Sequence, residues 1–355
     1  MVSKLAKNLS PLCWLPSGKL VCYQYGKLII LEGNKQLASY SLFSSKKEMI
    51  VGRIKPLFRL LRLGIRAAIA IDERHIVISI GNILHEMDLA NGKLSKGFFC
   101  GEGVRPLSFT TVNDIDNFDD GIYFGGYVGS FLKNPIHVYK RIGVDQWEII
   151  HTFPLGEIDH IHKVIVDPYR MCLWIFTGDF GDAAGIWKAE YNFNKVTPIL
   201  RGSQKYRSCV AFATPEGVIY ATDTPFQDNF IYLMNESGEL KIIQSINGSC
   251  IYGCKWKDKF VFSSTVELDG RNNTIKILTT SYKWGTGIKD SYAHLYVGSI
   301  ANGFTDVYKE KKDCWPPLFQ FASFHFPAGK NDLDMLFFQP VATNKNDLAL
   351  LGYKE

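Results

Sequence analysis

Two histidines stand two residues apart in the segment DHIHKVIVDPYRMCLWIFTGD, residues 159–179. On a β-strand, residues i and i+2 point to the same face, so His160 and His162 are expected to lie side by side. Three interpretations are open for the pair. They are two metal ligands that need a carboxylate such as Asp179 or Asp223, a general base or acid, or hydrogen-bonding groups without chemistry. The first would make a divalent metal the cofactor.

A second segment, YRSCVAFATPEGVIYATDT at residues 206–224, repeats the same order of strand, tight turn, strand and polar end. Tyr206 and Arg207 stand where the histidines stand in the first copy, and Asp223 matches Asp179. An arginine offers a planar fork of donors that suits a carboxylate. The two copies therefore predict one shared site, with these catalytic candidates: His160, His162, Tyr206, Asp179 and Asp223.

Pairs of short apolar runs that could position these residues recur along the whole chain. Seven units begin near residues 19, 75, 121, 173, 218, 260 and 318. Such a period is typical of a β-propeller, whose blades bury their faces against one another. We expect an all-β fold, a six- or seven-bladed β-propeller of four-stranded antiparallel blades, with residues 1–355 in a single domain. The C-terminal LALLGYKE is expected to close the ring by pairing near Leu20.

One stretch interrupts the repeat. Residues 46–66, KKEMIVGRIKPLFRLLRLGIR, are basic and apolar together. We interpret them as an insertion or loop in which Pro56 starts a short helix through Arg62. The alternative is an amphipathic segment that faces a membrane or a partner.

The innermost strands of a propeller line its central channel, so equivalent positions of the repeats should face one funnel. Aligning the repeats on their turns adds residues at the same end of the ring, and aromatic rings among them could stack on sugars. The expected substrate-binding residues are Arg66, Arg207, Tyr127, Asn229, Trp187, Tyr252 and Glu267.

Composition excludes several classes of protein. The net charge of +5, from 40 basic and 35 acidic residues, does not indicate a nucleic-acid partner and tolerates an anionic ligand. Cys250 and Cys254 have no matching second pair, which argues against a zinc site made by cysteines. The N-terminal sequence lacks the features of a signal peptide, and no apolar run reaches the length of a membrane helix. We expect a cytoplasmic protein without a membrane span.

Residues 120–235 carry GGY, HVYKR, TFPLGEIDHIHKVIVDPY, LWIFTGDFGDAAGIWKAE, RGSQKYR and TDTPFQDNFIYL in this order. This order resembles the BNR-repeat, sialidase-like β-propeller proteins found among microbial surface-polysaccharide genes, although a full Asp-box is absent. The grouping of His, Tyr and Arg is also similar to propeller polysaccharide lyases, in which an arginine or a metal neutralises a uronate carboxylate. The polar positions implied by the resemblance are His160, His162, Asp167, Thr177, Asp179, Tyr206, Arg207, Asp223 and Asn229.

These observations predict a carbohydrate-active propeller. It would be a glycoside hydrolase or a polysaccharide lyase that acts on an anionic glycan, sialic-acid-like or uronate, of a surface polysaccharide. The partner would be an oligo- or polysaccharide. The alternative is a propeller without catalysis that binds a glycan or a protein in polysaccharide biosynthesis.

Overall fold

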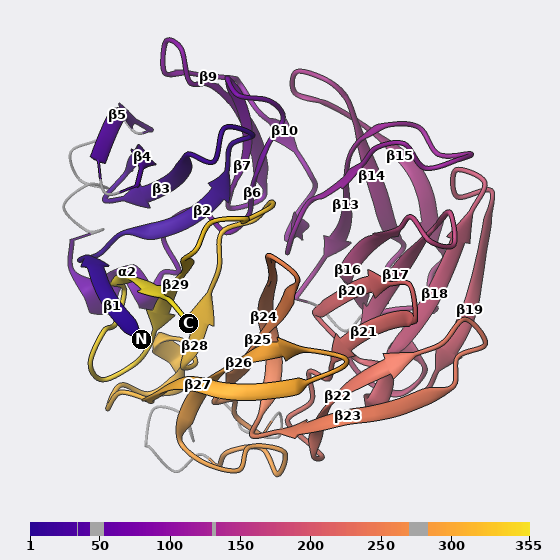
Figure 1. The fold of residues 1–355 in the computed structure, drawn as a ribbon. Coiled ribbons are helices and arrows are strands. Elements are labelled where there is room, and N and C mark those ends of the chain that lie inside the picture. The colour runs from indigo at the N-terminus through magenta and orange to yellow at the C-terminus, as the bar shows by residue number, and fades with distance from the viewer. Residues whose placement is uncertain (34, 43–52, 130–132, 270–282) are drawn as a thin grey trace.

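The chain folds into a ring of seven antiparallel sheets, numbered here as blades 1 to 7 in chain order (Figure 1). A computed structural model describes residues 1–33, 35–42, 53–129, 133–269 and 283–355. The predicted all-β propeller is therefore confirmed, and the number of blades is seven.

Each blade starts at the ring axis and steps outward strand by strand. Blade 1 holds β2 (Ser10–Trp14), β3 (Leu20–Gln24), β4 (Lys27–Glu32) and β5 (Lys35–Ser41). Blade 2 holds β6 (Ala68–Ala70), β7 (His75–Ile80), β8 (Ile83–Asp88), β9 (Lys93–Leu94) and β10 (Phe98–Phe99). Blade 3 holds β11 (Arg105–Pro106), β12 (Thr110–Val112), β13 (Gly121–Tyr127), β14 (Ile136–Gly143) and β15 (Gln146–Phe153).

The next three blades are regular four-stranded sheets. Blade 4 holds β16 (His160–Asp167), β17 (Cys172–Gly178), β18 (Gly185–Glu190) and β19 (Lys195–Arg201). Blade 5 holds β20 (Val210–Thr214), β21 (Gly217–Ala221), β22 (Asn229–Met234) and β23 (Leu240–Ile246). Blade 6 holds β24 (Ser249–Trp256), β25 (Lys259–Thr265), β26 (Tyr292–Ser299) and β27 (Gly303–Lys311).

Blade 7 joins the two ends of the chain. It holds β28 (Ser323–His325), β29 (Leu336–Val341), β30 (Leu350–Tyr353) and, as its outermost strand, β1 (Val2–Ala6). The closing partner of the C-terminal strand is thus β1, with Val2 opposite Tyr353, and the predicted pairing near Leu20 is wrong. Leu20 belongs to β3, whose two edges are already paired with β2 and β4.

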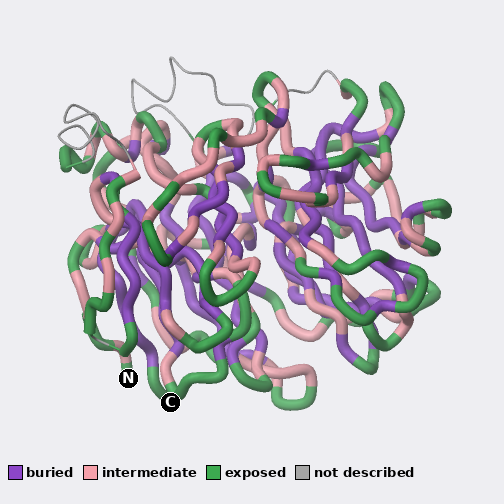
Figure 2. The backbone as a smooth tube through the Cα atoms, turned by 90° about the horizontal axis from the view of Figure 1, so that it is seen from above, coloured by how far each residue is buried: buried purple, intermediate pink, exposed green. Residues whose placement is uncertain are grey.

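Burial follows the position of a strand in its blade, because each blade is covered on both faces by its neighbours. All seven residues of β17 and all five of β21 are buried, whereas β23 buries only Ile246. Trp174 and Phe176 pack against Ala211 and Tyr220 of the next blade in one apolar cluster. Figure 2 shows the resulting gradient, with buried residues along the inner strands and exposed residues at the outer turns.

Short helices fill the connections. They are α2 (Lys55–Leu60) and the 3-10 turns η1 (Gly181–Ala183), η2 (Gln204–Tyr206) and η3 (Pro317–Phe319). The short helix predicted from Pro56 through Arg62 is present as α2, which begins one residue earlier, at Lys55, and ends at Leu60. Arg59 anchors this helix to blade 7, because its buried guanidinium pairs with Asp313 and Asp347. Residues 46–52 of the basic stretch lie outside the described residues.

Blade 6 departs from the predicted repeat. The apolar run TIKILTT, residues 274–280, was expected to supply a strand beside β25 and lies outside the described residues. In the structure β25 pairs with β26, which begins only at Tyr292. The connection between the two strands is therefore much longer here than in blades 4 and 5.

Candidate active site

The candidate site lies where the innermost strands β16 and β20 begin and the second strands β17 and β21 end. His160 is the first residue of β16, and Asp179 directly follows β17. Arg207 precedes β20, and Asp223 follows β21. The antiparallel pairing within blades 4 and 5 brings these starts and ends to the same end of the ring, near its axis (Figure 1).

The two histidines and Asp179 converge on one point. His160 Nε2 lies 3.0 Å from His162 Nε2, and the two nitrogens lie 3.3 and 3.0 Å from Asp179 Oδ1. All three residues are buried. A bulge in β16 between Ile161 and Lys163 leaves His162 as the extra residue of the strand. With this bulge, the His162 imidazole lies against His160 and Asp179.

Hydrogen bonds leave this group incomplete. His160 Nδ1 lies 2.9 Å from the carbonyl of Val128, so Nδ1 carries the proton and Nε2 presents its lone pair. Asp179 Oδ1 and His162 Nδ1 are buried and have no hydrogen-bond partner. Buried polar atoms without partners are costly and often mark a missing ion or water.

These residues fit a divalent cation. Donor atoms bound to one cation at about 2.1 Å stand about 3.0–3.4 Å apart, which matches the distances above. Two imidazoles with one carboxylate are a common donor set for first-row divalent metals. The bond from His160 Nδ1 to a backbone carbonyl is the outer contact that orients a metal-binding imidazole.

A second set of three groups is less suited to a metal. His162, Cys209 and Asp223 also lie close enough to share an ion. The Cys209 thiol lies 3.3 Å from Asp223 Oδ2, and burial raises the pKa of this thiol well above 9.0. Metals bind thiolates rather than thiols, so the set with Asp179 is the better candidate.

Arg207 joins the two acids of the site. Its Nε lies 3.3 Å from Asp179 Oδ1 and 3.5 Å from Asp223 Oδ2. Burial alone would lower the pKa of Arg207, but the charges of Asp223 and Asp179 outweigh burial and raise it. Burial would raise the pKa of Asp179, yet its contacts with His160 and His162 and the charge of Arg207 hold it well below its usual range. Two carboxylates thus face one guanidinium, and the excess negative charge favours a cation.

Glu267 behaves differently from these two acids. Burial, reinforced by the charge of Asp223, raises its pKa to about 8, so Glu267 is protonated at neutral pH. Burial also lowers the pKa of His160 below 6.5, which keeps that imidazole neutral. The site therefore combines neutral and ionised groups, a contrast that is frequent in active sites.

Aromatic rings complete the wall of the funnel. The Tyr127 ring lies 4.3 Å from the His160 ring, and the Arg105 guanidinium lies over the Tyr127 ring at 5.0 Å. From blade 6, the Tyr252 ring lies 3.9 Å from the ring of His325 in β28. Burial lowers the pKa of His325 to about 4 and raises that of Tyr127 to about 12.

Several predicted residues meet in this site, and three do not. Tyr206 ends η2 and packs into the apolar cluster between blades 4 and 5. Trp187 is buried in another cluster and donates its Nε1 proton to Thr177, so it cannot stack on a sugar. Asn229 is fully buried and bonds to Thr222 and the backbone of its own loop. The predictions for Trp187 and Asn229 are wrong because neighbouring blades and loops enclose these side chains, whereas Tyr206 is half-buried and packs against the apolar cluster.

Asp167, a position implied by the resemblance, also lies away from the site. It is the last residue of β16, at the other end of the ring, and binds Trp174 and Arg170.

Sequence analysis missed Arg105, Cys209, His325 and Asp159. Asp159 Oδ2 accepts a hydrogen bond of 3.0 Å from the backbone of Asp179 and so fixes the end of β17. His325 stands at the start of blade 7, where SFHF is a weak copy of the strand that begins HIH. Arg105 precedes the innermost strand of blade 3, as Arg66 and Arg207 precede theirs, and this shared position was the available signal.

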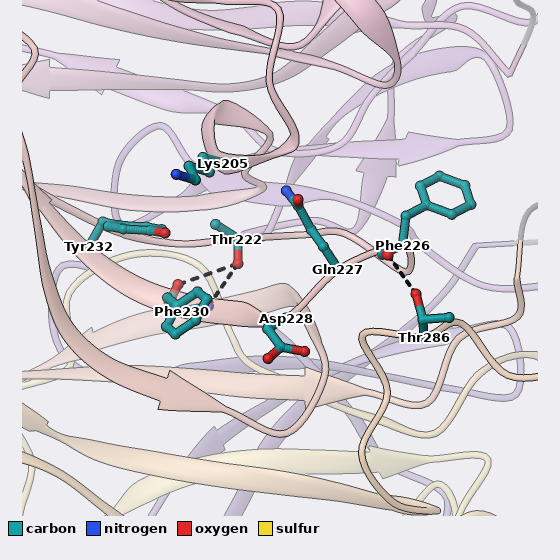
Figure 3. Close-up of a pocket in the computed structure, with 8 residues that line it drawn as sticks. All are labelled: Lys205, Thr222, Phe226, Gln227, Asp228, Phe230, Tyr232 and Thr286. Carbon is teal, nitrogen blue, oxygen red and sulfur yellow. Dashed lines mark hydrogen bonds between the residues drawn. The ribbon is translucent and has the colours of Figure 1, made fainter.

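A recess of about 490 Å³ opens on blade 5, and it shares no lining residue with the histidine group. Figure 3 shows Lys205, Gln227 and Tyr232 around it, with Thr286 donating a hydrogen bond to the Phe226 carbonyl. Phe226 stacks 5.5 Å from Phe180, whose ring lies 5.5 Å from the Arg207 guanidinium. The recess is thus a neighbour of the site rather than the site itself.

Comparison with solved structures identifies the architecture. An oligogalacturonate lyase in complex with manganese matches with a TM-score of 0.61 and 13% identity, over 99% of this chain and 92% of that one. A chain of a mitotic checkpoint complex matches with a TM-score of 0.56 and 9% identity, over 100% of this chain and 93% of that one. The Cps50 (Swd1) propeller domain of Myceliophteria thermophila matches at 0.56 and 8% identity, over 100% of each chain. At these identities the matches establish the fold alone.

No protein-family model and no curated protein matches the sequence.

Within the described part of the chain, no helix has the length and apolar character needed to cross a membrane.

Proposed function

We propose that this propeller is a polysaccharide lyase that cleaves an anionic, uronate-containing glycan by β-elimination. The carrying observation is the convergence of His160 Nε2, His162 Nε2 and Asp179 Oδ1 within 3.0–3.3 Å, with Asp179 Oδ1 lacking a hydrogen bond. An oligogalacturonate lyase that binds manganese shares the fold, which supports the proposal. The similarity of the His, Tyr and Arg grouping to propeller polysaccharide lyases, in which an arginine or a metal neutralises a uronate carboxylate, also supports the proposal.

His160, His162 and Asp179 would hold a divalent cation. Such a cation, when bound, neutralises the uronate carboxylate and thereby acidifies the proton on C5. Arg207 keeps Asp179 ionised, and the Val128 carbonyl keeps the lone pair of His160 directed at the site. The chain thus pre-orients the donors before any ligand arrives.

Two neutral groups of the funnel wall are suited to move the protons. His325 has a pKa of about 4 and is a neutral imidazole at neutral pH, with its Nε2 3.2 Å from the Ser323 hydroxyl, so it would be able to accept the C5 proton. Tyr127 has a pKa of about 12 and keeps its phenolic proton, so it can protonate the leaving oxygen. In this elimination the C5–H and C4–O bonds break, a C4=C5 double bond forms, and the electron pair of the C4–O bond leaves with the oxygen.

A hydrolase is the second candidate, and one observation favours it. Glu267 is protonated at neutral pH with a pKa of about 8, while Asp179 is ionised. One protonated and one ionised carboxyl group are what a glycosidase uses as acid and base. The product distinguishes the two reactions, because only elimination makes an unsaturated sugar that absorbs ultraviolet light.

The test is an assay of the full-length chain with Mn²⁺ and either polygalacturonate or alginate. We expect ultraviolet absorbance to rise with time for the wild type. The rate of this rise should be at least about 100-fold lower for His162→Ala. His137→Ala is the matched control, because His137 lies on β14 and bonds to Thr152 on the outer part of blade 3. Saturated products would favour the hydrolase, and binding without turnover would favour a non-catalytic propeller.

A further inference from the structure

Three arginines precede the innermost strands of blades 2 and 3. Arg66 precedes β6 in blade 2, Arg105 lies in β11 of blade 3, and Arg62 follows α2. In the β11–β13 ladder Arg105 is paired with Tyr127, whose ring it covers at 5.0 Å. Arg105 therefore approaches His160 from the side of blade 3, with the Tyr127 ring between them.

Arg66 and Arg105 are not neutralised. Among the described residues, neither guanidinium forms an ion pair or donates a side-chain hydrogen bond, and Arg105 Nε is buried without a partner. Arg207, by contrast, faces the carboxylates of Asp179 and Asp223. Arg207 was expected to bind a carboxylate of the substrate, but its guanidinium already faces two carboxylates of the protein.

The two guanidinium groups also repel each other. The pKa of Arg66 is lowered to about 10, first by partial burial and then by the charges of Arg105 and Arg62. Burial likewise lowers the pKa of Arg105, and Arg62 adds to this effect. Like charges held together without a counter-charge are relieved by an anion that binds between them.

We propose that Arg66 and Arg105 form an anion subsite that receives the carboxylate of the sugar adjoining the one bound at His160, His162 and Asp179. This inference rests on the proposed function and specifies its substrate class, a chain with acidic groups on consecutive sugars. The Tyr127 ring lies between the two places, 5.0 Å from the Arg105 guanidinium and 4.3 Å from the His160 ring. The Tyr127 ring thus contacts both places and separates the two subsites.

The test compares ligands with one and with several charges. Calorimetry with galacturonate and with trigalacturonate, each with Mn²⁺, is run on the wild type and on the double variant Arg66→Gln/Arg105→Gln. We expect the double variant to bind the trimer about 10–100-fold more weakly and with a smaller salt dependence, and to bind the monomer as the wild type does. Arg74→Gln removes an equally charged but exposed arginine that is paired with Asp88. This variant should bind the trimer and the monomer as the wild type does.

A second probe separates this inference from the proposed function. Inorganic sulfate, at constant ionic strength against chloride, should raise the melting temperature of the wild type and of Arg74→Gln, and should not raise that of the double variant. Sulfate binding without any uronate binding would retain the anion subsite and overturn the uronate substrate. Trigalacturonate binding that is equally tight in the double variant would overturn the subsite and leave the lyase proposal standing.

Discussion

Asp179 connects every charged group of the site. It contacts His160, His162 and Arg207, and its backbone N–H donates to Asp159 while its carbonyl accepts from Gln204. A buried carboxylate is costly unless it is paired, and here three nitrogens lie within 3.0–3.3 Å of Asp179 Oδ1 although none makes a hydrogen bond to it. The position of Asp179 is thus fixed from both sides, as a metal ligand requires.

Glu267 provides a prediction about pH. Its pKa rises from 4.5 in its ordinary state to about 8 in the folded chain, so folding takes up a proton between these values. The free-energy cost of burying the negative charge of Glu267 is therefore absent below pH 4.5. It grows as the pH rises and is complete above pH 8. Glu267→Gln should be more stable than the wild type by on the order of 3 kcal/mol at pH 9 and by little at pH 5, as measured by urea unfolding.

Glu216→Gln is the control for this experiment, because Glu216 is exposed in the β20–β21 turn. Its stability should follow that of the wild type at both pH values. A Glu267→Gln variant with the same stability difference at pH 5 and pH 9 would contradict the assignment of a protonated Glu267.

Residue types and their repeat positions located much of the site from sequence. His160, His162, Arg207 and Asp223 were found because two copies of one unit place polar residues at matching points. Trp187 and Asn229 were assigned to the funnel incorrectly, because sequence periodicity does not show which neighbour covers a side chain. Arg66 was predicted to bind substrate, but the absence of an acidic partner for Arg66 and Arg105 could not be recognised from the sequence, since it depends on the packed fold.

At the scale of the strand, β16 and β17 are shaped for the two imidazoles. The bulge at His162 changes the direction of β16, and Gly178 stands opposite His160 at the end of β17. A side chain at position 178 would have no room, because a Cβ there would lie 2.2 Å from His162 Cε1 and 2.5 Å from its Nε2. Glycine at the end of β17 is therefore needed for the second imidazole to reach the site.

Gly178→Ala should consequently displace His162 while blade 4 persists. We expect Mn²⁺ affinity to fall about 10–100-fold, with a circular dichroism spectrum like that of the wild type. Gly129→Ala is the matched control, because no atom lies within 4 Å of the Cβ that it would add. Unchanged Mn²⁺ affinity in Gly178→Ala would show that His162 is not a ligand.

Strand positions were predicted well in blades 1 to 5, where the units expected near residues 19, 75, 121, 173 and 218 coincide with β3, β7, β13, β17 and β21. The starts of β16 and β20 follow from apolar runs that alternate with turn residues such as Asp167-Pro168 and Glu216-Gly217. In blade 6 the second strand of the unit was predicted in the apolar run at residues 274–280, which lies outside the described residues. The strand β26 begins further along the chain, at Tyr292. Local pattern identifies a strand, but the order of pairing depends on contacts between distant segments.

At the scale of the whole molecule, closure of the ring supports the funnel. Blade 7 takes its outermost strand from the N-terminus, and β1 pairs with β30 from Val2 opposite Tyr353 to Ala6 opposite Leu350. Blades 4 and 5 can hold their polar residues in place only while the ring as a whole stays closed. An open ring would also expose the edge of β30.

Removal of residues 1–6 should therefore weaken the whole propeller. We expect the melting temperature to fall by about 5–10 °C and self-association to appear on size-exclusion chromatography, because the exposed edge of β30 can pair with another chain. Lys4→Gln, which keeps the strand and changes one exposed side chain, should behave as the wild type. A truncated chain that melts at the wild-type temperature and stays monomeric would contradict closure by β1.

The central claim is that His160, His162 and Asp179 hold a divalent cation in the funnel. It is tested most directly by titrating the full-length chain with Mn²⁺ in a calorimeter and recording the electron paramagnetic resonance spectrum of the complex. We predict one Mn²⁺ per chain with couplings from two imidazole nitrogens, and loss of both the ion and the couplings in His160→Ala/His162→Ala but not in His137→Ala. Absence of stoichiometric binding in the wild type, or equal binding by the double variant, would contradict the account.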